Sequence, residues 1–517
     1  MKNWIWIILP LLAACGETTQ QQPEHIAQEE PYYQEAHRPQ YHFSPEEKWM
    51  NDPNGMFYYE GEYHLFYQYY PDSTVWGPMH WGHAISNDLV TWEHLPIALY
   101  PDELGLIFSG SAVVDWNNTS GFGVDDRPPL IAIYTYHDME AEQSGMSDDF
   151  QYQGIAYSND KGRSWTKYEG NPVLPNQGIR DFRDPKVMWY EPSQSWIMTL
   201  AVKDHVEFYE SPDLISWSKL SDFGIDAGAH GGVWECPDLF EMETDDGQLR
   251  WVLLVSINPG GPNGGSATQY FVGDFDGTTF TNEYSAEKTL WLDYGTDNYA
   301  GVTWSDIPEQ DGRRLFIGWM SNWNYARLTP TVKWRSAMTV TRELEMVENQ
   351  DGEFRVTSWP IMEYKKLATS TQKIQDDAQY KGYTIPLRHD LLDITLDIDL
   401  SQSSDFRVSF YNDLDDSVHL SYDKTNAEFS VDRGSSGVVG FEEGFAKIHT
   451  APYQVIENEM QLRIMLDWSS IETFVDGGML TMTEQVFPEK PFDQLIITSS
   501  GKLGISSDVS KLKSIWP

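Results

Sequence analysis

The stretch AISNDLVTW at residues 84–92 returns in two close copies, AYSNDKGRSW at 156–165 and YESPDLISW at 209–217. A weaker copy, GDFDGTTF, lies at 273–280. Turns with Asn-Asp or Pro-Asp are common in any β protein, but three close copies favour a structural repeat. The aspartates lie 72, 53 and 63 residues apart, a period typical of four-stranded propeller blades with loop insertions. They are Asp88, Asp160, Asp213 and Asp276.

Short apolar and aromatic runs, such as residues 63–67 and 130–134, surround these copies and are bounded by Gly, Asp, Asn and Pro. This pattern is typical of short strands. The stretch 38–350 has room for about five blades. A linker is expected at 351–375, and residues 376–517 alternate as the strands of a β-sandwich do. We therefore predict an all-β fold, a five-bladed β-propeller followed by a C-terminal β-sandwich.

The charge of the chain restricts its partners. The 517 residues include 35 basic and 79 acidic side chains, for a net charge of −44. Such a surface repels nucleic acid and anionic lipid. It suits a neutral partner, and it also keeps a protein soluble in salty surroundings; charge alone does not choose between these. No nucleic-acid partner is expected.

The first 14 residues have the character of a secretory signal. A single lysine precedes an apolar run that is too short to span a bilayer. The segment Leu12-Ala13-Ala14-Cys15 resembles a bacterial lipobox, in which the peptide is cut before the cysteine and the thiol is acylated. We expect a lipoprotein signal peptide at 1–14, lipidation of Cys15, a flexible tether at 15–37 and an extracytoplasmic, lipid-anchored protein that touches the membrane only through the lipid. The alternative is an ordinary secretory peptide with an incidental cysteine.

Three acidic residues share one local pattern. Asp52 lies in WMNDPNG (49–55), Asp184 in IRDFRDPKVMWY (179–190) and Glu235 in GGVWECPDLF (231–240), each one or two residues before a proline. Proline favours an extended residue before it, and Asn54-Gly55 is expected to turn the chain. Inner strands of a propeller converge on one axial pocket, so the three acids could meet there. Paired carboxylates perform glycoside hydrolysis. With 79 acids in the chain, chance placement before prolines is the alternative.

These boxes, in this order and spacing, resemble the three signature boxes of glycoside hydrolase family 32, the β-fructofuranosidases, which include invertases, levanases and inulinases. The resemblance continues through LFYQYYP (65–71), WGPMHWGHA (76–84), FSGS (108–111), DYGTDNYA (293–300) and GWMSNW (318–323). It implies a five-bladed propeller with an appended β-sandwich, in agreement with the repeat. It also implies a retaining hydrolase that releases fructose from β-D-fructofuranosides, exo-acting on levan or inulin and able to use sucrose.

The resemblance also assigns roles to residues. Asp52 would be the nucleophile, Glu235 the general acid and then base, and Asp184 the stabiliser of the transition state. Arg183 would bind the sugar and keep Asp184 ionised. Asp52 is expected to stay ionised because amide donors surround it. The substrate-binding residues would be Trp49, Asn51, Gln68, Trp76, Phe108, Ser109, Arg183 and Trp319.

No cofactor is expected, and no metal, because His80, His83 and His230 lack a zinc-binding spacing. Cys236 is expected to pack beside Glu235 and not to act as a nucleophile.

Three other functions remain open from the sequence. A fructosyltransferase would use the same carboxylates and give the fructosyl unit to a sugar. A sialidase is suggested by SNDKGRSW (158–165), but that Asp-box is a structural turn, and the arginine cluster that a sialidase needs for its carboxylate substrate is missing near the boxes. A surface lipoprotein that only binds glycan would need aromatic walls without three intact acids, so their presence favours an enzyme.

Overall fold

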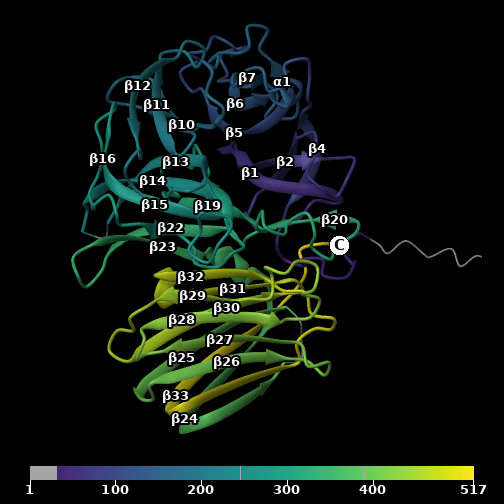
Figure 1. The fold of residues 1–517 in the computed structure, drawn as a ribbon, viewed down its shortest axis with the longest axis vertical. Helices are drawn as coiled ribbons and strands as arrows, with labels where there is room; N and C mark the ends of the chain where they lie inside the picture. Colours follow the sequence, from purple (N-terminus) through teal and green to yellow (C-terminus); the bar gives the residue numbers. More distant parts are fainter. Residues whose placement is uncertain (1–31, 245, 388–390) are drawn as a thin grey trace, which may run out of the picture.

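The computed structural model describes residues 32–517 except residues 245 and 388–390. Figure 1 shows two β domains in contact, an upper domain of radiating sheets and a lower domain in green and yellow. The predicted signal peptide, Cys15 and most of the tether lie outside the described residues. In the part of the chain that the structure describes, no helix has the length and apolar character needed to cross a membrane.

The upper domain is a propeller of five blades, each a mainly antiparallel sheet. The first contains β1 (Lys48–Tyr59), β2 (Glu62–Tyr70), β3 (His80–Ser86) and β4 (Glu93–Leu99), and the second β5 (Leu106–Val114), β6 (Leu130–His137), β7 (Gln151–Ser158) and β8 (Thr166–Lys167). The third contains β9 (Phe182–Tyr190), β10 (Ser195–Val202), β11 (His205–Ser211) and β12 (Ser218–Phe223). The fourth contains β13 (Val233–Glu243), β14 (Leu249–Asn258), β15 (Ala267–Phe275), β16 (Phe280–Asn282) and β17 (Leu290–Trp291). The fifth contains β18 (Tyr299–Thr303), β19 (Arg314–Met320), β21 (Ala337–Met338), β22 (Arg342–Glu348) and β23 (Phe354–Pro360).

The ring of blades is closed by hydrogen bonds between its two ends. The short strand β20 (Trp334–Arg335) follows β19 in the chain but pairs in parallel with β1 of the first blade. A strand from the end of the propeller thus completes the sheet at its beginning. This pairing leaves no gap between the first and fifth blades, as closure of the ring requires.

The repeated aspartates connect the third and fourth strands of four blades. Asp88 follows β3, Asp160 follows β7, Asp213 follows β11 and Asp276 follows β15. In the third blade the carboxylate oxygen Oδ1 of Asp213 accepts hydrogen bonds from the backbone N–H groups of Ile215 (2.9 Å) and Ser216 (2.7 Å). The same contact pattern recurs at Asp88 and Asp276. The repeat is therefore a turn device, and the predicted five-bladed propeller is confirmed.

The lower domain is a β-sandwich. Its strands are β24 (Ala368–Pro386), β25 (Leu392–Gln402), β26 (Asp405–Tyr411), β27 (Ser417–Asp423), β28 (Glu428–Ser435), β29 (Ile448–Pro452), β30 (Glu459–Asp467), β31 (Ser470–Val475), β32 (Leu480–Gln485) and β33 (Gln494–Leu512). The long strand β33 pairs with β24, β25 and β26 and so joins the two halves. Apolar side chains from both halves form one core, which confirms the predicted sandwich.

Two predicted boundaries differ from the structure. β23 completes the fifth blade at Pro360, the 3-10 helix η1 covers Met362–Leu367, and β24 begins at Ala368, so the connection is shorter than the expected linker at 351–375. The predicted tether also ends earlier, because Tyr33 is buried and stacks on Trp516 with ring centroids 3.9 Å apart. Tyr33 therefore packs with the folded domain although it stands in a polar stretch of the sequence.

Candidate active site

The five inner strands of the propeller all carry a break in register at one end. These breaks lie beside Asp52 on β1, Ser109 on β5, Asp184 on β9, Glu235 on β13 and Tyr299 on β18. A β-bulge leaves a residue out of the ladder and redirects its neighbours. The bulges therefore turn side chains from five blades toward one end of the axis.

Proline accompanies three of the five breaks. Pro185 and Pro237 stand within the breaks on β9 and β13, and Pro53 ends the break on β1. Proline has no N–H to give to a ladder. The expected turn at Asn54-Gly55 is wrong, because β1 continues through both residues to Tyr59. Gly55 instead adopts a φ of 56° at a second register shift. The acid is thus held inside a bent strand and not at a strand end.

A pocket of about 460 Å³ opens where the bulged residues meet. The three predicted carboxylates come to it from three blades, together with most of the predicted substrate-binding residues. Those lining the pocket are Asn51, Asp52, Gln68, Trp76, Phe108, Ser109, Arg183, Asp184 and Glu235.

Asp52 accepts two hydrogen bonds at the pocket surface. The side-chain amide of Asn51 donates to Oδ1 at 3.0 Å, and the hydroxyl of Ser109 donates to Oδ2 at 2.9 Å. Trp49 holds that amide in turn, because its indole N–H donates to Asn51 Oδ1 at 2.7 Å. Burial and the negative charge of Glu235 nevertheless raise the pKa of Asp52 to about 6. The predicted ionised state therefore holds only above mildly acidic pH.

Asp184 is linked to Asp52 through Cys236. The backbone N–H of Cys236 donates to Asp184 Oδ2 at 3.1 Å, and its thiol lies 3.6 Å from the same oxygen and 3.7 Å from Asp52 Oδ2. Burial and the surrounding carboxylates raise the pKa of this thiol well above its usual range. The thiol is thus a buried donor between two acids, as expected for a packed residue and not for a nucleophile.

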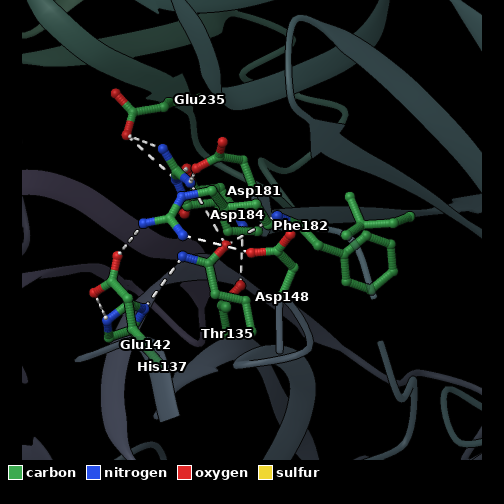
Figure 2. Close-up of polar contacts among 12 residues, drawn as sticks. Thr135, His137, Glu142, Asp148, Asp181, Phe182, Asp184 and Glu235 are labelled. Carbon is green, nitrogen blue, oxygen red and sulfur yellow. Dashed lines mark hydrogen bonds and ion pairs between the residues drawn. The ribbon is translucent and has the colours of Figure 1, made fainter. Parts of the chain in front are cut away.

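Arg183 acts on Asp184 in the expected direction, since its charge lowers the pKa of that acid, but it does not offset the effect of burial. Burial raises the pKa of Asp184 to about 7, although the Arg183 guanidinium acts in the opposite direction. The reason is geometric, because Arg183 Nε lies 4.0 Å from Asp184 Oδ2 but Nη2 lies 2.9 Å from Glu235 Oε1. Arg183 Nη1 also donates to Asp181 Oδ1 at 2.6 Å, and Figure 2 labels Asp181, Asp184 and Glu235. Arg183 therefore holds Glu235 more directly than Asp184.

Tyr299 is a functional residue that the sequence reasoning missed. Its hydroxyl donates to Oε2 of Glu235, so the acid is held from both oxygens by Tyr299 and Arg183. The residue belongs to the stretch DYGTDNYA (293–300), which resembles the family but carries no acid before a proline. Its position at the bulge of β18 is set by pairing with β19, which a single sequence does not display.

The aromatic walls differ in part from the prediction. Trp76 and Phe108 line the pocket with ring centroids 6.1 Å apart. Trp49 and Trp319 are fully buried behind it, so they support the wall and cannot touch a sugar. Trp323, which packs on both, takes that place at the pocket surface. Trp323 lies between β19 and β20 and not on a strand, so the alternation of side chains along a strand does not reveal it.

One amide at the pocket is free to bind a hydroxyl. Gln68 is 2% exposed, yet its Nε2 has no hydrogen-bond partner among the described residues. An unpartnered buried donor is costly. A ligand oxygen in the pocket would remove that cost, in agreement with the predicted role of Gln68.

The rim of the pocket carries charged residues that the sequence did not indicate. The helix α1 (Met139–Ser144) places Glu142 beside the pocket, where it bonds His137 (3.1 Å) and Arg180 (3.0 Å). Figure 2 labels His137 and Glu142 together with Asp184 and Glu235, and all four residues line the pocket.

Among the described residues one group has the geometry of a metal site, His205, Glu207 and Asp222. The Lys219 ammonium lies 2.7 Å from Glu207 and 2.6 Å from Asp222, so a cation already neutralises these carboxylates. This group lies on the third blade, away from the pocket residues.

Comparisons with known proteins agree with the arrangement. Residues 42–360 match the N-terminal domain of glycosyl hydrolases family 32, and residues 363–516 match the family 32 C-terminal domain. The levanase of Bacillus subtilis (strain 168) is 49% identical over 501 residues, which cover 94% of this chain and 72% of the levanase. The extracellular exo-inulinase of Aspergillus awamori is 38% identical over 525 residues, covering 94% and 96%.

Solved structures give the same result. The crystal structure of the Aspergillus awamori exo-inulinase matches with a TM-score of 0.86 and 36% identity, covering 94% of this chain and 100% of that one. The fructofuranosidase of Schwanniomyces occidentalis, complexed with fructose, matches with a TM-score of 0.84 and 32% identity over 94% and 100% of the chains. Both domains and the three carboxylate boxes are thus accounted for by one family, and the chain belongs to glycoside hydrolase family 32.

Proposed function

We propose that this glycoside hydrolase releases fructose, one unit at a time, from the ends of fructans such as levan or inulin, and that it also hydrolyses sucrose. The observation that carries the proposal is the convergence of Asp52, Asp184 and Glu235 in one pocket. The similarity to a levanase, an exo-inulinase and a fructofuranosidase supports the same substrate class.

The residues suggest how the reaction proceeds. Asp52 attacks C2 of the terminal fructosyl unit while Glu235 gives its proton to the departing glycosidic oxygen, so that the C2–O bond breaks. Glu235 then takes a proton from water, and that water attacks C2 and frees Asp52. Two displacements at one carbon give retention of configuration. Asp184 accepts hydrogen bonds from ring hydroxyls, and Gln68 donates to them.

The shape of the pocket supports an exo mode. Residues from the first four blades, together with Trp323 and Arg327 of the segment between β19 and β20, line the pocket on all sides of the carboxylates. Such an enclosed pocket suits the terminal sugar of a chain. An endo enzyme would need a groove that continues past the reacting carbon.

Product analysis on levan, inulin and sucrose tests the proposal. We expect early release of free fructose from all three, with slow loss of polymer length. Mixed oligosaccharides and a rapid fall in chain length would contradict the exo mode. Transfer of fructosyl units to sugar, with little free fructose at low substrate concentration, would identify a fructosyltransferase instead.

The proposed location is extracytoplasmic, with the mature chain anchored through acylated Cys15. The apolar leader, the lipobox-like residues 12–15 and the extracellular exo-inulinase relative support this location. We expect Cys15→Ala to release the protein from the membrane fraction with unchanged sucrose hydrolysis. Equal membrane association of the variant and the native protein would remove the proposal.

A further inference from the structure

A second cavity, of about 520 Å³, lies at the other end of the propeller axis. Each of the strands β5, β9, β13 and β18 runs from the active site toward the second cavity. Its residues at the active site come first in the chain, and its residues that line the second cavity follow a few positions later. On β9, for example, Asp184 faces the first pocket and Trp189 the second. Five residues of strand span about 16 Å. The two cavities therefore open at opposite faces of the propeller.

Polar side chains lie at the base of this distal cavity, and some of their hydrogen-bonding atoms lack a partner among the described residues. Asp238 is 1% exposed; its Oδ2 accepts from the backbone N–H and the hydroxyl of Thr303, but its Oδ1 has no partner among the described residues. Lys186 Nζ lies 3.4 Å from the same carboxylate. Arg314, which also lines the cavity, donates to Glu241 O at the long distance of 3.4 Å. A ligand with hydroxyl groups could donate to Asp238 and accept from Arg314.

Two tryptophans at the cavity are held in fixed orientations. Trp116 is 61% exposed, yet its indole N–H donates to Asp306 Oδ1 at 2.9 Å, and Asp306 is itself bound by the backbone N–H of Val114. The indole N–H of Trp189 donates to Glu191 at 2.7 Å. An exposed ring held in one orientation loses little entropy when a flat apolar ligand face packs on it.

The charges at the cavity exclude an anion. Lys186 and Arg314 are outnumbered by the four carboxylates of Asp238, Asp306, Glu191 and Glu241. Fixed aromatic faces, unpartnered hydroxyl-binding groups and net negative charge together suit a neutral sugar ring. We propose that the distal cavity is a second, non-catalytic binding site for a neutral saccharide chain.

Such a site would affect how the enzyme meets a polymer. That the bound saccharide is a fructan rests on the proposed function. That the ligand is a neutral saccharide rests on the residues of the cavity alone. A polymer bound at one face keeps other chain ends at high effective concentration near the active site on the opposite face. Sucrose is too small to gain from this effect.

The test uses affinity electrophoresis through gels that contain levan, inulin or dextran. The protein carries Asp52→Asn so that the polymer stays intact, with Trp116→Ala and Trp189→Ala added singly and together. We expect the added substitutions to weaken retention by about tenfold on at least one polymer. Trp116→Phe, which keeps a ring, should retain most of the binding.

A second measurement separates this site from the active site. In the chain with Asp52 intact, the tryptophan variants should keep the kcat and KM of sucrose hydrolysis while the KM for the polymer rises. Equal retention with and without the tryptophans on all three polymers would overturn the proposal, as would an equal loss of sucrose hydrolysis. Because retention is measured in an inactive variant, failure here is distinct from failure to release fructose.

Discussion

Ser109 sets the pH at which the nucleophile becomes active. Its hydroxyl donates to Asp52 at 2.9 Å and so favours the ionised carboxylate, whose pKa burial raises to about 6. Protonated Asp52 cannot attack, so kcat/KM should fall as the pH drops below about 6. Removing the donor raises the pKa further, and we expect Ser109→Ala to move the acid limb up by about one pH unit. The measurement is a pH profile of kcat/KM on sucrose.

Ser111 provides the matched control. It lies on the same strand, but its hydroxyl accepts from the backbone N–H of Val187 and does not contact Asp52. Ser111→Ala should leave the acid limb where the native enzyme has it. An unmoved limb in Ser109→Ala would show that this hydroxyl does not control the ionisation.

At the residue scale the sequence predicted the carboxylates better than their surroundings. Asp52, Asp184 and Glu235 stand in short boxes that are readable without a structure. The burial of Trp49 and Trp319 is not readable in this way, because the packing of each strand against the rest of the fold decides which of its faces is buried. Tyr299 was missed because a register shift in the pairing of β18 with β19 sets its position, and Trp323 because it lies outside any strand, between β19 and β20.

At the scale of the element, the turn aspartates hold the outer edge of each blade. Asp213 bonds two backbone N–H groups between β11 and β12. We expect Asp213→Ala to lower the free energy of unfolding by about 1–3 kcal/mol, because the two donors lose their partner. Chemical denaturation followed by tryptophan fluorescence measures this change. Sucrose hydrolysis should remain, since the turn lies far along the blade from the axis.

Asp226 serves as the comparison, an exposed aspartate in the loop that follows β12. Asp226→Ala should change the free energy of unfolding by no more than about 0.5 kcal/mol. If both variants lost the same stability, the turn would not be the stabilising device.

The blade count was predictable because these turns are local, whereas the closure by β20 and the bulges depend on long-range pairing.

At the scale of the whole molecule, buried charges join the propeller to the sandwich. His42 lies between Asp467 and Glu472 of the sandwich, 2.7 Å from each. Arg342 of the fifth blade contacts Asp293 and Glu472, and both are buried. Such pairs destabilise strongly when one partner is removed. The two domains are therefore expected to unfold together.

The pH dependence of stability tests this junction. Burial lowers the pKa of His42, but the hydrogen bonds to Asp467 and Glu472 outweigh it and raise the pKa to about 9. A raised pKa stabilises the fold fully below the unfolded value of about 6.5, and the stabilisation is lost as the pH rises to about 9. We expect the native protein to lose about 3 kcal/mol from this group between those values.

His42→Gln should remove that part of the pH dependence and lower stability at pH 6.5. The control is His230→Gln, because His230 makes a half-exposed pair with Asp204. It should keep the slope of the native protein. The free energy of unfolding is measured by urea unfolding across this pH range. If it changed equally with pH in the native protein, His42→Gln and His230→Gln, His42 would not be charged at the junction.

The covalent bond between Asp52 and fructose is the central claim about the mechanism. The measurement uses the Glu235→Gln variant and fructosyl fluoride as the substrate. Fluoride departs without a general acid, so the covalent intermediate still forms. The variant lacks the general base, so hydrolysis of that intermediate is slow. Peptide mass spectrometry should find one fructosyl unit, fructose less water, on the peptide that contains Asp52, and none when Asp52→Asn is added. A fructosyl unit on another residue, or no adduct while fluoride is still released, would contradict the assignment of Asp52 as the nucleophile.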